Sequence, residues 1–185
     1  MVVKRALILT WTGFQDQEVV YPYYRLIAEK FEVELVADRR DELGRVYGIL
    51  GINMPCTLLM SEFISKMETN ALSYDFLVLP GGVKSLEKLR QQKQILNFIH
   101  QWDAAGKIIA STCHGAQLLI SAKVVKGRKI SGYYSLEDDI KNAGAIYSKN
   151  PVVVDKNIIS SPHYDFMGEW MEVALMQYKS MKPDF

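Results

Sequence analysis

Hydrophobic positions fall in short apolar runs separated by longer stretches with helical spacing. The apolar runs have the length of buried strands and lie at 6–10, 33–37, 76–79, 107–111, 152–154 and 158–160. The stretches of helical spacing predict helices at about 17–30, 61–67, 86–106, 115–124, 138–142 and 166–181. Pro22 is placed near the start of the first helix, where a missing amide hydrogen does least harm. Strands that alternate with helices predict an α/β sandwich with a mainly parallel sheet and helices on both faces.

One segment departs from this alternation. Residues 38–57 are polar, contain Gly44, Gly48 and Gly51, and hold only short apolar runs. We expect a small hairpin or an irregular excursion there. The chain of 185 residues is long enough for one sizeable core and shows no linker or internal repeat, so a single domain over 1–185 is predicted.

Composition and charge narrow the classes of function. Hydrophobic residues make up 49% and charged residues 23%, and 22 basic residues against 21 acidic ones give a net charge of +1. A nucleic-acid or anionic-membrane partner would need a marked basic excess, so neither is expected. No apolar run approaches the roughly 20 residues that span a bilayer, and the first run is too short for a signal peptide. We therefore expect a cytoplasmic protein.

The cysteines and histidines do not form a metal motif. Cys56 and Cys113 are expected to be free thiols in a reducing compartment, with Cys56 packed in the core. His100, His114 and His163 lack the spacing of local zinc sites. No metal and no cofactor are predicted.

Cys113 stands out because it follows a predicted strand and precedes a predicted helix, in Ser-Thr-Cys-His-Gly at 111–115. A sharp turn at this junction exposes one side chain at the end of a parallel sheet, which is the plan of a nucleophile elbow. Gly115 suits a backbone that passes close to another element. Amides at a helix start would lower the pKa of the thiol and bind an oxyanion. The alternative is a buried structural cysteine.

Three neighbours could complete such a site. His114 is either a general base or only a neighbour of the thiol. Glu18 follows the first strand and could set the ionisation of the thiol, although a glutamate there is often a surface residue. Gly81 and Gly82 follow the strand at 76–79 and could offer backbone amides to an oxyanion, or form an ordinary turn.

Six ordered segments resemble the ThiJ/PfpI superfamily, and most closely its PfpI-type intracellular protease branch. They are Glu18-Val-Val-Tyr-Pro-Tyr-Tyr-Arg-Leu26, Leu79-Pro-Gly-Gly82, Cys113-His-Gly-Ala-Gln-Leu-Leu119, Gly127-Arg-Lys129, Asp138-Asp139 with Asn142-Ala-Gly144, and Val152-Val-Val-Asp155. Together these segments span nearly the whole chain.

The resemblance implies a flavodoxin-like, three-layer sandwich of the class I glutamine-amidotransferase-like group. It places the nucleophile of the family on Cys113, the histidine that follows it on His114, and the glutamate that contacts the thiol on Glu18. It also places an oxyanion-side glycine on Gly82 and a crevice tyrosine on Tyr133. It further implies a homodimer or a higher homo-oligomer.

Two departures from the resemblance concern the pocket. Relatives read Tyr-Pro where this chain has Tyr133-Tyr134, and Ser-Arg-x-Pro where it has Ser161-Pro-His-Tyr164. His163 is then either a pocket histidine or a histidine of a surface loop. The altered loop leaves the substrate and the oligomer open.

Two functions remain. The first is a cysteine-dependent enzyme acting on an electrophilic carbonyl or amide of a small-molecule or peptide substrate, with glyoxalase/deglycase-like or peptidase/amidase-like chemistry. The second is a non-enzymatic redox-sensing or chaperone-type stress protein with an oxidisable Cys113.

Overall fold

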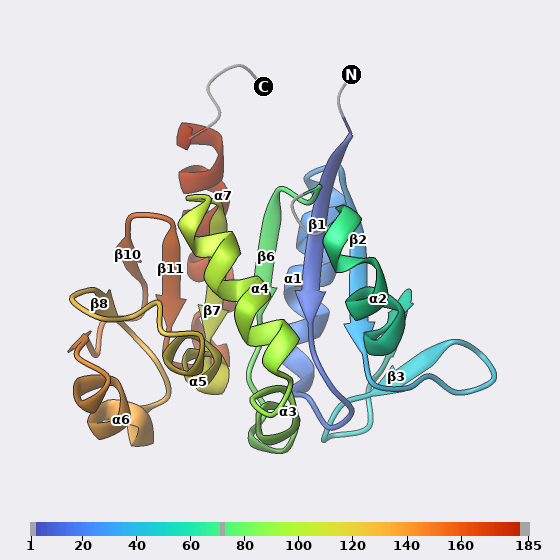
Figure 1. The fold of residues 1–185 in the computed structure, drawn as a ribbon, viewed down its shortest axis with the longest axis horizontal. Helices are drawn as coiled ribbons and strands as arrows, with labels where there is room; N and C mark the ends of the chain where they lie inside the picture. Colours follow the sequence, from blue (N-terminus) through green and yellow to red (C-terminus); the bar gives the residue numbers. More distant parts are fainter. Residues whose placement is uncertain (1–2, 71–72, 182–185) are drawn as a thin grey trace.

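The fold is built on a seven-stranded sheet with the order β10-β11-β7-β6-β1-β2-β5 (Figure 1). The computed structural model describes residues 3–70 and 73–181. The strands are β1 (Lys4–Leu9), β2 (Phe31–Ala37), β5 (Leu58–Leu59), β6 (Phe76–Leu79), β7 (Ile108–Thr112), β10 (Val153–Asp155) and β11 (Ile158–Ser161). Neighbouring strands are parallel except β10 and β11, which form an antiparallel hairpin. The predicted mainly parallel α/β sandwich is confirmed.

Helices cover both faces of this sheet. The helices are α1 (Asp16–Ala28), α2 (Met60–Asn70), α3 (Val83–Leu89), α4 (Lys93–Ala104), α5 (Ala116–Ser121), α6 (Glu137–Asn142) and α7 (Met167–Met181). In Figure 1, α2, α4 and α5 lie in front of the sheet, and α1 and α7 lie behind it. Side chains alternate along β1, so Leu7 and Leu9 join the front core while Ala6 and Ile8 join the rear core.

Two predictions about the helices are wrong. The apolar positions between 86 and 106 belong to two helices, because Gln92 adopts an extended conformation between α3 and α4. Pro22 lies in the middle of α1 rather than near its start, and it is buried. Burial of the proline ring offsets part of the lost backbone hydrogen bond.

The predicted excursion at 38–57 is a hairpin of β3 (Arg45–Tyr47) and β4 (Asn53–Pro55). The buried carboxylate of Asp16 accepts hydrogen bonds from the backbone N–H groups of Leu50 and Ile52, both at 2.8 Å. These bonds fasten the loop of the hairpin to the start of α1. A second small sheet pairs β8 (Lys129–Ile130) with β9 (Ile146–Tyr147), which the sequence did not predict.

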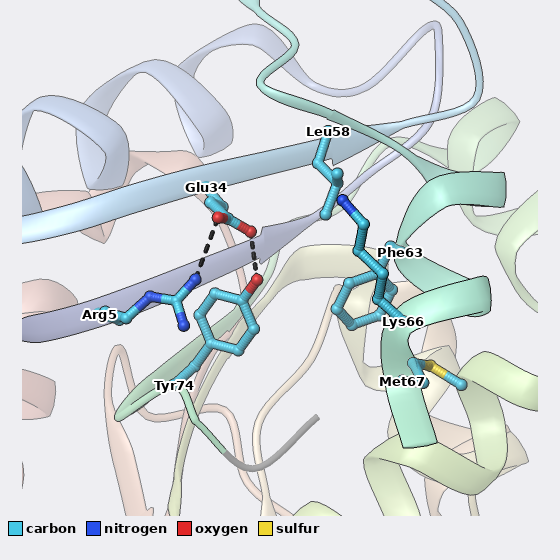
Figure 2. A pocket seen from close by; sticks show the side chains of 7 residues that line it. All are labelled: Arg5, Glu34, Leu58, Phe63, Lys66, Met67 and Tyr74. Atoms are coloured by element: carbon cyan, nitrogen blue, oxygen red, sulfur yellow. Dashed lines mark hydrogen bonds and ion pairs between the residues drawn. The ribbon is translucent and has the colours of Figure 1, made fainter. Parts of the chain in front are cut away.

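A small cavity of about 140 Å³ lies between β1, β2 and α2 (Figure 2). Glu34 accepts hydrogen bonds from Arg5 at 3.1 Å and from the hydroxyl of Tyr74. The Arg5 guanidinium also lies 4.4 Å from the centre of the Tyr74 ring. These polar groups therefore satisfy one another, and this cavity lies away from Cys113.

In the described ranges, no helix combines the length and the apolar character needed to cross a bilayer. The carboxyl ends of the parallel strands β1, β6, β7 and β11 meet at one edge of the sheet, at the bottom of Figure 1. Crevices at this edge are the usual ligand sites of such sheets.

Candidate active site

Cys113 lies at the predicted strand-to-helix junction. It follows the extended Thr112 at the end of β7 and begins a short 3₁₀ turn, η1 (Cys113–Gly115), from which α5 continues. Its φ of +54° is in the left-handed region, where a residue with a side chain is strained. The elbow geometry is therefore present, although only 6% of Cys113 is exposed.

Gly115 is required because the backbone of the elbow passes close to β6. A Cβ atom at this position would overlap the carbonyl oxygen of Leu79 and would lie 2.9 Å from the Ser111 Oγ. Only glycine lets the elbow pack against the neighbouring strand in this way.

Glu18 comes from the first turn of α1 and is fully buried. Its Oε2 accepts a hydrogen bond of 2.6 Å from the backbone N–H of Gly81, while its buried Oε1 has no hydrogen-bond partner. A Cβ atom on Gly81 would lie 2.5 Å from Glu18 Oε2 and 2.9 Å from Cys113 Cβ. The carboxyl group and the cysteine therefore converge on the bare backbone of Gly81.

Burial dominates the electrostatics of this pair. Burial raises the pKa of Glu18 to about 7, against the lowering effects of the Gly81 N–H and of Cys113. Burial and the charge of Glu18 raise the pKa of the Cys113 thiol, against the backbone groups of His114 and Gly82. The lowered thiol pKa expected from a helix start is therefore wrong, because burial raises the pKa of the thiol and the charge of Glu18 raises it further. The pair resists holding two negative charges, so the two groups titrate together.

The backbone of Gly82 reaches the sulfur of Cys113, as does that of His114. Gly82 has a φ of +102°, and a Cβ atom there would lie 2.6 Å from the backbone nitrogen of Gln15. The amide of Gly81 is already bonded to Glu18. Of the two glycines, Gly82 thus has the amide that faces the thiol.

The side chain of His114 turns toward the thiol, although adjacent residues in a turn need not point in the same direction. Its Nδ1 is 3.2 Å from Cys113 Sγ, and burial lowers the pKa of its imidazole. A neutral imidazole at this distance can accept the thiol proton. Its ring stacks on Tyr133 with 4.6 Å between ring centres, and the N–H of Tyr133 donates to the Cys113 carbonyl at 3.1 Å.

His163 belongs to the same group of rings. Its ring centre is 6.1 Å from that of Tyr133 and 3.8 Å from that of Tyr164. Its Nδ1 is 3.0 Å from a carboxylate oxygen of Asp165. Tyr134 also stacks on His163, with 6.4 Å between ring centres. The sequence did not identify Tyr134 as a site residue. Its ring and that of His163 come from turns far apart in the sequence, and no residue spacing shows that they are close.

Cys56 lies apart from this group. It is buried next to the β3–β4 hairpin, its thiol donates to the Leu58 carbonyl at 3.4 Å, and burial raises its pKa. In the part of the chain that the structure describes, no three His, Cys, Asp or Glu side chains gather closely enough to hold a metal ion.

The chain is similar to known proteins over most of its length. The model of the DJ-1/PfpI family matches residues 4–177. "Deglycase PfpI" of Pyrococcus furiosus is 36% identical over 167 residues, covering 90% of this chain and 95% of that protein. "Protein/nucleic acid deglycase 2" of Escherichia coli is 41% identical over 154 residues, covering 83% and 85%.

A solved structure supports the fold. The ThiJ/PfpI domain protein of Brachyspira murdochii superposes with a TM-score of 0.83 at 18% identity, covering 97% of this chain and 99% of that one. The flavodoxin-like architecture implied by the resemblance is thus confirmed. From the match along residues 4–177 and the identities to these relatives, the chain belongs to the DJ-1/PfpI family.

Proposed function

We propose that the chain is a cysteine-dependent enzyme that acts on reactive carbonyl compounds, in the manner of a glyoxalase or deglycase. The observation that carries the proposal is Cys113 in a left-handed elbow, 3.2 Å from His114 Nδ1 and beside the buried Glu18. The relatives named as deglycases support this class of reaction.

The small opening over the thiol favours a small electrophile. Cys113 is 6% exposed, and the ring of Tyr133 lies against His114 beside it. An aldehyde carbon, or its adduct with an amine, can approach such a sulfur more easily than a peptide bond inside a folded chain. Amide hydrolysis uses the same groups and is the competing reaction.

The first step forms a bond between Cys113 Sγ and the aldehyde carbon of an α-oxoaldehyde. The thiol proton passes to His114 Nδ1, the C=O π pair moves onto oxygen, and the N–H of Gly82 stabilises the oxygen. The imidazole then returns its proton to that oxygen, which gives a hemithioacetal.

Two further steps complete the reaction. The base Glu18 takes the proton from the carbon bonded to sulfur, and the electron pair moves through an enediol, so that a proton returned to the neighbouring carbon leaves a thioester. Water then cleaves the thioester and frees the thiol. The sum is one α-oxoaldehyde and one water giving one 2-hydroxy acid. For an amine adduct the first step differs: Cys113 Sγ bonds to the carbon as the C–N bond breaks, and the thiol proton, passed through His114, leaves on the amine. The later steps are the same.

Turnover by Cys113 variants tests the proposal. We expect the purified protein to consume methylglyoxal, and we expect Cys113→Ala and Cys113→Ser to lose activity by about 100-fold or more. Cys56→Ala is the matched control, because it removes the other buried thiol without touching the site. Activity that survives in Cys113→Ala contradicts the proposal.

Parallel assays separate the competing functions. Cys113-dependent cleavage of fluorogenic amides without methylglyoxal consumption would assign the site to amide hydrolysis. If the protein turned over neither substrate and peroxide converted Cys113 to a stable oxidised form, the thiol would be assigned to redox sensing.

A further inference from the structure

Five rings form a continuous surface at the mouth of the site. The surface, named the aromatic ladder here, consists of His114, Tyr133, Tyr134, His163 and Tyr164. Neighbouring ring centres lie 4.6 Å (His114–Tyr133), 6.1 Å (Tyr133–His163), 6.4 Å (Tyr134–His163) and 3.8 Å (His163–Tyr164) apart. The planes of these four pairs differ by 21° to 37°, and those of Tyr133 and Tyr134, whose centres are 5.7 Å apart, differ by 43°.

Three separate turns build the ladder at the carboxyl edge of the sheet. They are η1, which follows β7, η2 (Tyr134–Leu136), which follows β8, and η3 (Tyr164–Phe166), which follows β11. In η2 and η3, the residue just before the turn carries a ring of the ladder, and the first residue of the turn carries another. Two of these turns follow strands of the seven-stranded sheet, and the third follows β8 of the small β8–β9 sheet.

His163 is the centre of the ladder, and its Nδ1 contacts Asp165. Its Nδ1 is 3.0 Å from the Asp165 carboxylate and 3.4 Å from the Asp165 backbone nitrogen. Its side chain is only 19% exposed, whereas Tyr134 and Tyr164 are exposed. A ring fixed by one edge, between exposed phenol rings, offers a preformed flat surface to a ligand.

We propose that the aromatic ladder binds an aryl group of the substrate, and that His163 determines a preference for aryl over alkyl α-oxoaldehydes. This inference rests on the proposed function, because the reacting carbonyl is the one that Cys113 attacks. The ladder begins at His114, which contacts the thiol, and runs outward to Tyr164. An aryl group bonded to the reacting carbonyl can stack on these rings, whereas a methyl group cannot.

Substrate selectivity tests the proposal. Phenylglyoxal and methylglyoxal share the reacting group and differ only in the phenyl and methyl substituents. We expect the wild type to have the higher kcat/KM for phenylglyoxal. We expect His163→Ala to lower this value about fivefold, mostly through KM, and to lower kcat/KM for methylglyoxal by a clearly smaller factor. His163→Phe should restore the preference, and His100→Ala, on the distant α4, should change neither substrate.

A measurement that needs no turnover makes the result independent of the proposed reaction. Phenylglyoxylate and pyruvate should protect Cys113 from alkylation, the former at an at least fivefold lower concentration, and His163→Ala should abolish that difference. Equal protection by the two acids, or equal losses of kcat/KM for both aldehydes in His163→Ala, would overturn the proposed binding of aryl groups. If Cys113→Ala kept its activity while phenylglyoxylate still protected the wild-type thiol selectively, only the proposed function would be overturned.

Discussion

At the scale of single residues, the buried Glu18 and Cys113 control the chemistry of the site together. Burial makes each group costly to ionise, and the charge of Glu18 raises the pKa of the Cys113 thiol further, whereas Cys113 lowers the pKa of Glu18. Protonation of Glu18 therefore favours the thiolate, because it removes the like charge beside the sulfur. The reactivity of Cys113 thus belongs to the pair rather than to a helix end.

The raised pKa of Glu18 predicts a pH dependence of stability. Burial raises this pKa from 4.5 to about 7, so the folded state holds a proton that the unfolded state has lost between these values. Stability from this group is therefore complete below about pH 4.5 and is lost as the pH rises through 7. In Glu18→Gln the titration is absent. We expect the free energy of unfolding of the variant to gain up to about 3 kcal/mol on the wild type between pH 5 and pH 8.

Urea unfolding at several pH values measures this difference. Glu87→Gln is a suitable control, because Glu87 is an exposed glutamate on α3. A difference between Glu18→Gln and wild type that stays constant across the pH range would show that Glu18 is not held with a raised pKa.

At the scale of elements, the elbow depends on the contact between η1 and β6. Gly115→Ala would place a methyl group against the Leu79 carbonyl oxygen, so strand and turn must separate. We expect a loss of roughly 2 kcal/mol or more in the free energy of unfolding. We also expect the position of the Cys113 side chain to be less well fixed. In Gly168→Ala, on α7, the added methyl group would meet only Tyr21 Oη at 3.8 Å. That control should be neutral or slightly stabilising, and similar losses in both variants would contradict the argument.

The predicted elements show where sequence patterns succeed. The strands at 76–79 and 107–111 are recognisable because each has a short apolar centre, and turn or polar residues follow it. The break at Gln92 was missed because apolar residues resume at Ile95 with a spacing that still fits a helix. Pairing between β8 and β9 joins two-residue segments distant in sequence, which no local pattern can reveal.

Some residues of the candidate site could be identified from the sequence, and others could not. Cys113, His114 and Gly82 could be chosen from their places at strand ends, and the structure brings them together. Glu18 was a candidate from its place after the first strand, and only the family resemblance favoured it over a surface glutamate, which is usual in the first turn of a helix. The pKa of Cys113 was misjudged because burial depends on the packing of α1 over the elbow, which the sequence does not specify.

At the scale of the whole molecule, a polar cluster fastens the end of the sheet opposite the site. Asn157 Nδ2 donates to Asp103 Oδ1 at 3.0 Å and to the Lys107 carbonyl at 2.9 Å, and its Oδ1 accepts from Arg128 at 3.1 Å. Arg128 also pairs with Asp103 at 3.0 Å. The cluster joins α4, the segment before β7, the start of β8 and the β10–β11 turn.

Removal of Asn157 should separate stability from activity. Asn157→Ala removes three hydrogen bonds to half-buried groups, so we expect a loss of about 2 kcal/mol in the free energy of unfolding. We expect kcat/KM to stay within about twofold of wild type, because the site lies at the other edge of the sheet. The control is Asn97→Ala, an exposed position on α4. A large fall in kcat/KM with unchanged stability would refute this division.

The left-handed backbone at Cys113 makes this position unfavourable for any residue with a side chain. At ordinary positions alanine is the more stable replacement, but at a φ of +54° glycine is free of the steric cost of a Cβ atom. Cys113→Gly should therefore be more stable than Cys113→Ala, by about 1 kcal/mol, in a thermal melt. A sulfur at this position therefore costs stability that glycine would not, which is the cost we expect of the proposed nucleophile at the edge of the sheet.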